Sequence, residues 1–180
     1  MSDKTRCHWV SEANDILKKY HDEEFSVPNI DDDYLFEILV LVNFQTGLSW
    51  EIMLRKREAF RDAFDGFDVE MIANYGDEKI EDLLSNENII RNRNKINAVI
   101  NNAQVFIEIQ KEHGSFYDYI KTFTNGEIFH ERGLTESELS RDMVKDLKKR
   151  GMKYLGPVTM YSYLQTVGVI NSHEESFFLF

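Results

Sequence analysis

The sequence predicts an all-α fold, because apolar residues recur at helical spacing while the alternating pattern of a β-strand is scarce. Between residues 35 and 42, apolar side chains stand at positions i, i+3, i+4 and i+7, which places them on one face of a helix. The segment 95–112 repeats this spacing, and Gly114 behind it suits the left-handed turn that ends many helices.

Capping residues indicate where further helices begin. Ser49 is suited to cap a helix that ends near Phe64, because its hydroxyl can accept a free backbone N–H of the first turn. Thr135 and Glu138 have the spacing of a capping box, for a helix that runs to Arg150. Further helical segments are expected at residues 69–74, 79–84 and 158–166.

A single domain over residues 1–180 is expected, with two helical lobes around a shared cleft. The 180 residues are 42% hydrophobic, which is enough for one core, and no Ser/Gly-rich linker interrupts them. Cys7 is the only cysteine, so no intramolecular disulfide can form and a reducing cytoplasm is expected. The polar N-terminus predicts no signal peptide, and the longest apolar run, residues 38–42, is too short to cross a membrane.

The formal net charge of -11 argues against a nucleic acid as partner, because phosphate contacts need Lys and Arg. The distribution of charge is more informative than the total. Residues 141–153 hold six basic side chains against two acids, and residues 91–95 form a second basic cluster. Without further context, a solvated helix face is the favoured interpretation of such a segment.

A glycine-containing turn directly follows the longer basic segment. Residues 154–157 separate two predicted helices, which gives a helix-hairpin-helix pattern. Because Gly156 has no side chain, the backbone amides around it can approach a phosphate, and Lys149, Arg150 and Lys153 would add positive charge. Most Gly-Pro turns only connect packed helices, so the pattern leaves DNA contact and simple packing as two equal alternatives.

Several separated segments carry a more specific pattern, in one consistent order along almost the whole chain. They are Cys7 to Trp9, Tyr20 to Pro28, Leu35 to Glu37 with Gln45 to Trp50, Ile89 to Arg91 with Lys95 and Ile96, Leu147 to Tyr163, and Gly168 to His173. Together they resemble the DNA-3-methyladenine glycosylase I family, within the helix-hairpin-helix DNA glycosylases. The resemblance implies a monomeric, monofunctional hydrolase without lyase activity, which binds double-stranded DNA and removes an alkylated base such as 3-methyladenine.

The resemblance also implies a base pocket walled by Trp9, Tyr20 and Trp50. Such enzymes turn the damaged nucleotide out of the duplex, at a cost of a few kcal/mol that contacts in the pocket must offset. A cationic base such as 3-methyladenine is attracted to aromatic faces by about 0.5–2 kcal/mol per ring. The commonest role of a buried aromatic is simply core packing, and here the motif favours the pocket.

One functional position of the family is changed. Where the family places a glutamate that accepts hydrogen bonds from the base, this sequence has Val42, followed by Asn43 and Phe44 in place of glycine and glutamine. A hydrogen bond to a charged group is worth about 1.5–3 kcal/mol, or roughly one to two powers of ten in affinity. Asn43 offers an amide nearby, whereas Glu37 matches a different family glutamate and is not a substitute. Milder changes place Phe25 where the family has tryptophan and Ser26 where it has glycine.

The family's structural zinc site is also incomplete. Cys7, His21 and His173 match three of its four ligands, while the fourth position is Phe177. Because structural zinc almost always takes four protein ligands, we expect no zinc, with apolar packing of the C-terminal tail in its place. Completion of the set by His8, Glu174 or Glu175 is the alternative, and no organic cofactor is expected.

Three functions therefore compete. The first is a working glycosylase for alkylated purines, with base selectivity altered or reduced by Val42. The second is a non-catalytic binder of damaged DNA that has lost its base-reading glutamate. The third, suggested by the net charge of -11, is an acidic helical scaffold for another protein.

Overall fold

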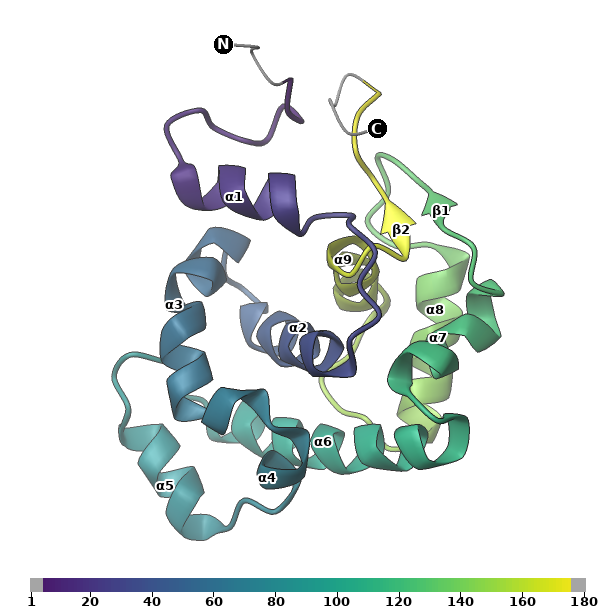
Figure 1. Cartoon of the computed structure of the whole chain (residues 1–180). Coiled ribbons are helices and arrows are strands. Elements are labelled where there is room, and N and C mark those ends of the chain that lie inside the picture. Colours follow the sequence, from purple (N-terminus) through teal and green to yellow (C-terminus); the bar gives the residue numbers. More distant parts are fainter. Residues whose placement is uncertain (1–4, 176–180) are drawn as a thin grey trace.

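A single helix, α2 (Asp32–Gln45), lies at the centre of the computed structural model, which describes residues 5–175. Figure 1 shows the other helices arranged around it, with α6 running beneath. Every residue of α2 from Leu35 to Phe44 is buried, so the helix packs on all sides and not only along the stripe seen in the sequence.

The expected all-α fold is confirmed. The elements around α2 are α1 (Asp15–Glu23), α3 (Trp50–Ala63), the short 3₁₀ helix η1 (Asp65–Phe67), α4 (Val69–Ala73), α5 (Asp77–Ser85), α6 (Arg93–His113), α7 (Phe116–Thr124), β1 (Phe129–His130), α8 (Glu138–Lys149), α9 (Pro157–Thr166) and β2 (Ile170–Asn171).

The predicted helix boundaries agree with the structure at most positions. The Ser49 side chain accepts the backbone N–H of Ile52 at the start of α3, and Gly114 ends α6 with a φ of 94°. The predicted position of the capping box before α8, at Thr135 and Glu138, is wrong. Its N-cap is Ser137, paired with Ser140, because the helix begins two residues later than Thr135 suggested.

Two α-helices, the 3₁₀ helix η1 and a short strand pair were not predicted from the sequence. Helices α1 and α7 are short, and β1 pairs in parallel with β2 over two residues each, with Phe129 opposite Ile170. The two strands have only two residues each, too few to show an alternating pattern, whereas α1 and α7 do have an amphipathic pattern that the sequence analysis missed. The pair links the segment before α8 to the end of the chain after α9.

The segment that connects α1 to α2 is tied to the end of α9. The backbone N–H of Ser26 donates to the carbonyl of Gln165 at 2.8 Å, and that of Asn29 donates to Val167 at 3.1 Å. Ser26 has a φ of 57°, a conformation that favours glycine, which is the residue that the resemblance leads one to expect at this place. Its buried hydroxyl offsets the strain by donating to the carbonyl of Ile170 and accepting the N–H of Ser172.

The hairpin between α8 and α9 is held from below by α6. Asn102 is buried, and its amide accepts the N–H of Lys153 at 2.8 Å and donates to the carbonyl of the same residue at 2.9 Å. The neighbouring Asn101 donates to the carbonyl of Gly151 at 2.7 Å. The turn is therefore held by side chains from a distant part of the sequence, since Asn102 and Lys153 are 51 residues apart.

Within the described residues, no helix has both the length and the apolar character that a membrane span requires.

Candidate functional site

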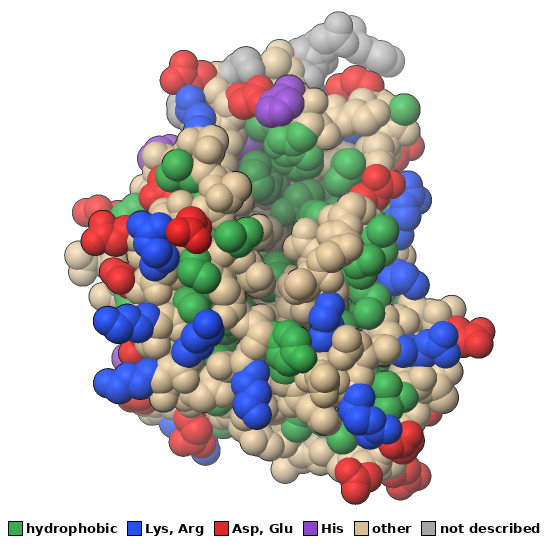
Figure 2. Space-filling model, turned by 180° about the vertical axis from the view of Figure 1, so that it is seen from behind, with side chains coloured by type: hydrophobic (Ala, Val, Ile, Leu, Met, Phe, Trp, Pro, Cys, Tyr) green, Lys and Arg blue, Asp and Glu red, His purple; other side chains and the backbone are tan. Residues whose placement is uncertain are grey.

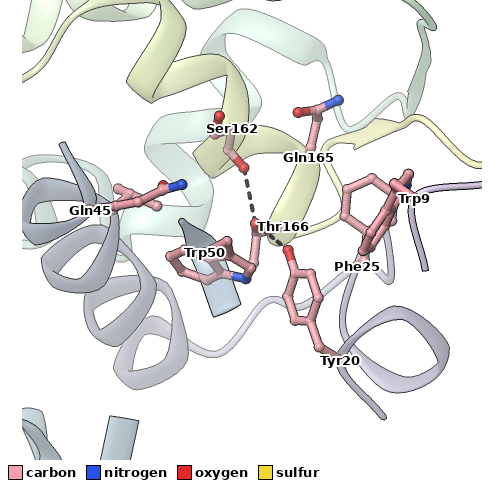
Figure 3. Close-up of a pocket in the computed structure, with 9 residues that line it drawn as sticks. Trp9, Tyr20, Phe25, Gln45, Trp50, Ser162, Gln165 and Thr166 are labelled. Atoms are coloured by element: carbon pink, nitrogen blue, oxygen red, sulfur yellow. Dashed lines mark hydrogen bonds between the residues drawn. The ribbon is translucent and has the colours of Figure 1, made fainter. Parts of the chain in front are cut away.

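A cavity of about 180 Å³ lies between the N-terminal segment with α1, the adjoining ends of α2 and α3, and helix α9. All four residues that the sequence predicted for the base pocket line it. Figure 2 shows a hollow with hydrophobic walls on this side of the molecule, and Figure 3 shows the lining side chains. The nine are Trp9, Tyr20, Phe25, Val42, Gln45, Trp50, Ser162, Gln165 and Thr166.

The aromatic side chains that line the cavity stand at angles to one another. The Trp9 and Phe25 rings lie 5.2 Å apart at 80°, and the Tyr20 and Trp50 rings lie 5.8 Å apart at 58°. Trp9 is 37% exposed and lies at the mouth, whereas Tyr20 is 5% exposed and forms the inner wall. This arrangement can hold a flat ring by stacking and by attraction between ring faces and positive charge.

Helix α9 contributes a polar wall that the sequence analysis missed. Ser162, Gln165 and Thr166 are spaced i, i+3 and i+4, so they share the face of α9 that lines the cavity. This polar stripe on an otherwise apolar helix was the available signal. The Gln165 amide donates to the Ser172 hydroxyl at 2.8 Å, which fixes its orientation beside the cavity.

The hydroxyl groups of the inner wall form a short chain. Thr166 Oγ1 donates to the backbone carbonyl of Ser162 at 3.0 Å, and lies 2.8 Å from Tyr20 Oη (Figure 3). Burial raises the pKa of Tyr20, so its phenol stays protonated at neutral pH. Tyr20 is thus a neutral polar group in an aromatic wall.

None of the described residues that line the cavity is an Asp or a Glu. Val42 is buried and contributes only apolar surface. Glu37 accepts hydrogen bonds from Arg57 at 2.6 Å and from Arg61 at 3.0 Å, and Glu51 pairs with Arg55. The expectation that Glu37 is not a substitute is therefore supported by its partners.

The two residues after Val42 do not replace the missing acid either. Asn43 is 1% exposed but is not among the residues that line the cavity, so its amide does not serve the pocket in the way the sequence left open. Its amide atoms have no hydrogen-bond partner within the described part of the chain. Phe44 packs on Phe60 with ring centroids 4.9 Å apart.

In each of the two basic clusters, one cation that the sequence suggested for an anionic partner is bound to groups of the protein itself. Lys95 is buried, and its ammonium donates to the carbonyls of Phe44 and Thr46 at the C-terminal end of α2. Burial lowers its pKa, and the negative end of the helix dipole favours its charge. Arg150, which we expected beside DNA, is instead engaged by Asp146 and Glu112.

The predicted phosphate contacts lie at the other end of α9 from the cavity. Lys149 and Lys153 are exposed, and Gly156 is the N-cap of α9 with nothing within 4 Å of the place where a Cβ would stand. Its φ of -128° is ordinary, so the absent side chain matters for open space and not for backbone freedom. Figure 2 shows several Lys and Arg side chains spread across the face of the molecule that holds the hollow, with Asp and Glu side chains mostly nearer its edges. An anionic partner can therefore meet positive charge here despite the net charge of -11.

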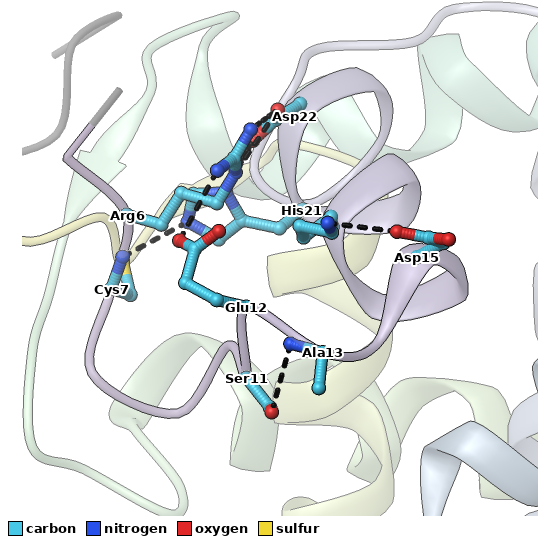
Figure 4. Close-up of polar contacts among 9 residues, drawn as sticks. Arg6, Cys7, Ser11, Glu12, Ala13, Asp15, His21 and Asp22 are labelled. Carbon is cyan, nitrogen blue, oxygen red and sulfur yellow. Dashed lines mark hydrogen bonds and ion pairs between the residues drawn. The ribbon is translucent and has the colours of Figure 1, made fainter. Parts of the chain in front are cut away.

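The three matched zinc positions gather where the two ends of the chain meet. The backbone N–H of Cys7 donates to His21 Nε2 at 3.4 Å, and the rings of His21 and His173 lie 5.1 Å apart. Figure 4 shows Arg6 on Asp22 beside this cluster. Burial raises the pKa of the Cys7 thiol and, with the neighbouring His21, lowers the pKa of His173 to about 4. Both groups are therefore neutral near pH 7.

These residues do not make a metal site by themselves. Within residues 5–175, no group of three or more His, Cys, Asp or Glu side chains is placed so that it could hold a metal ion. Glu174, one of the alternative ligands, pairs with His8, and its N–H donates to the Cys7 sulfur at 3.4 Å. The fourth family position, Phe177, lies outside the described residues.

Comparison with known proteins gives consistent matches. A family model described as methyladenine glycosylase matches residues 9–179. The DNA-3-methyladenine glycosylase 1 of Escherichia coli K12 is 37% identical over 174 residues, which cover 93% of this chain and 92% of that protein.

Solved structures match over the same extent. A crystal structure of 3-methyladenine DNA glycosylase I has 38% identity and a TM-score of 0.91, and the match covers 97% of this chain and 98% of that one. A Staphylococcus aureus 3-methyladenine DNA glycosylase I, solved to explain its recognition of 3-methyladenine, has 31% identity and a TM-score of 0.89. That match covers 94% of this chain and 93% of the other.

Proposed function

This chain belongs to the methyladenine glycosylase family, and from that premise we propose that it is a base-excision repair glycosylase acting on alkylated purines in double-stranded DNA. The observation that carries the proposal is the cavity of about 180 Å³ between aromatic faces, which suits one flat base. The reaction is hydrolysis of the N-glycosidic bond, as the names of the related enzymes indicate.

Helix α9 connects the place where a DNA phosphate could bind to the cavity where the base could bind. It begins at Pro157, directly after its N-cap Gly156 in the hairpin, and ends at Thr166 in the cavity, over ten residues and therefore about 15 Å. A phosphate bound at the N-terminal end of α9 would meet backbone N–H groups and the positive end of the helix dipole. A base turned out of the duplex would then enter the cavity at the other end of the same rigid helix.

The pocket can assist the reaction without a covalent nucleophile. A 3-methylated adenine in DNA carries positive charge, which makes it a good leaving group, and the ring faces of Trp9, Tyr20 and Trp50 favour that charge. Water can attack the sugar as the bond to the base breaks, so the pocket contributes mainly position and electrostatics. Without a carboxylate at Val42, binding of the cationic base should be about 10- to 100-fold weaker than in a pocket with one.

The neutral lining favours a second candidate, a binder of damaged DNA that releases no base. One experiment separates the two. Methylated duplex DNA is incubated with excess protein, and both the bound DNA and the free 3-methyladenine are measured. Release supports the glycosylase. Salt-sensitive binding without release supports the binder, and absence of both overturns the DNA function, because phosphate contacts must weaken with salt.

We further propose a monomer in the cytoplasm that folds without zinc. The buried thiol of Cys7 and the mutual contacts of Cys7, His21 and Glu174 support a cluster held by hydrogen bonds. Size measurement in solution tests the monomer, and metal analysis tests the absence of zinc.

A further inference from the structure

The hydroxyl of Thr166 has only one proton, and this proton is donated within helix α9. Thr166 Oγ1 lies 3.0 Å from the carbonyl oxygen of Ser162, one turn earlier in α9. A carbonyl can only accept, so Thr166 is the donor in this contact. The Thr166 hydroxyl then has only lone pairs left for other partners.

The contact between Thr166 and Tyr20 must therefore run in one direction. The two hydroxyl oxygens are 2.8 Å apart, and both groups are buried. Because Thr166 has already donated, the Tyr20 hydroxyl donates its proton to Thr166. The phenol oxygen keeps its lone pairs, and Figure 3 shows this oxygen among the side chains that line the cavity.

The neighbouring tryptophan takes up this acceptor only in part. The indole N–H of Trp50 interacts weakly with the Tyr20 hydroxyl, which is the smallest of the influences on the Tyr20 pKa, and within the described residues it makes no hydrogen bond of ordinary geometry. The Val42 side chain has no polar atom, so Tyr20 is an acceptor on the inner wall of a cavity whose described lining residues include no carboxylate.

We propose that Thr166 fixes the Tyr20 hydroxyl as a hydrogen-bond acceptor and thereby makes this pocket select bases that carry an amine. The inference rests on the proposed function, and it names a positioning residue, since Thr166 acts through Tyr20. Without the Thr166 hydroxyl, the Tyr20 proton loses its acceptor and can turn toward the cavity. The wall would then present a donor, which repels the N–H of an amine.

Binding of free bases tests this directly. The chain has two tryptophans, and both Trp9 and Trp50 line the cavity, so tryptophan fluorescence reports binding there. The two ligands are 3-methyladenine and 3-methylpurine, which has the same ring and methyl group but no amine. The intact protein should prefer 3-methyladenine by about three- to tenfold, the worth of one neutral hydrogen bond.

Variants separate the role of the hydroxyl from that of packing. Thr166→Val keeps the shape but loses the hydroxyl, and should bring the preference to parity or reverse it. Thr166→Ser should retain the preference, and Thr166→Ala provides a second variant without the hydroxyl if the valine does not fold. In a Tyr20→Phe background, Thr166→Val should change the preference no further.

The outcomes are distinct. An intact protein that binds neither base overturns the proposed pocket function, and this inference with it. An intact protein that prefers 3-methyladenine, with the same preference in folded Thr166→Val and Thr166→Ala, overturns the role of Thr166 alone.

Discussion

Gly168 lies against the backbone of Pro28 so closely that a Cβ on Gly168 would come within 2.3 Å of the Pro28 nitrogen. This contact joins the end of α9 to the segment between α1 and α2, and both contribute residues to the cavity wall. The backbone at Gly168 also has a φ of 79°, which strains any other residue.

Gly168→Ala should therefore lower the free energy of unfolding by about 2–4 kcal/mol, from a steric clash added to backbone strain. Chemical denaturation measures it. The matched control is Gly126→Ala, where φ is also 79° but the nearest atom is a flexible lysine carbon at 3.9 Å. That variant should lose only about 1 kcal/mol. Equal losses in the two variants would show that the contact with Pro28 is not tight.

Lys95→Met should destabilise the protein by about 1–3 kcal/mol, because it leaves the carbonyls at the end of α2 without their donor. Base binding should weaken as well, since Gln45 lies in this last turn and lines the cavity. Denaturation and fluorescence titration measure the two effects. Lys56→Met, which removes a half-buried lysine whose ammonium makes a solvent-exposed hydrogen bond to the Asn88 carbonyl, should change stability by less than about 0.5 kcal/mol.

Stability should fall on acidification partly through Asp22. The hydrogen bond from Arg6 is the largest cause that lowers the pKa of this carboxyl. A lowered folded-state pKa contributes stability that is present above the ordinary value of about 4 and is lost as the pH falls through the folded value. In Arg6→Met, melting temperature should be lower at pH 7 and should decline less between about pH 5 and pH 2. Parallel melting curves for the two proteins would contradict this assignment.

The zinc proposal predicts that chelator leaves the melting temperature of the purified protein unchanged. Phe177→Cys restores the family's fourth ligand in the sequence, so this variant should gain zinc and melt higher when zinc is supplied. Phe177→Ser is the control without a thiol. Stoichiometric zinc in the unaltered protein, removed together with its stability by chelator, would refute the proposal.

The sequence was sufficient for the family and the all-α fold, and the four residues that it predicts for a base pocket line one cavity. Periodicity identifies α6 because its buried residues recur over several turns, whereas in α2 it reveals one apolar stripe of a helix that is buried on all sides. It does not reveal that Lys95 is buried inside a basic run, because burial depends on where the end of α2 lies. The same limit applies to Thr166 and Tyr20, which are 146 residues apart and meet only in the folded chain.

Release of free 3-methyladenine from methylated DNA, measured in single turnover with protein in excess, tests the central claim most directly. The unaltered protein should release the base, and Val42→Glu should do so about 10- to 100-fold faster because a carboxylate then faces the cationic base. Val42→Gln, of similar length but neutral, should gain much less. No release from the folded, unaltered protein would contradict the account, whatever the two variants do.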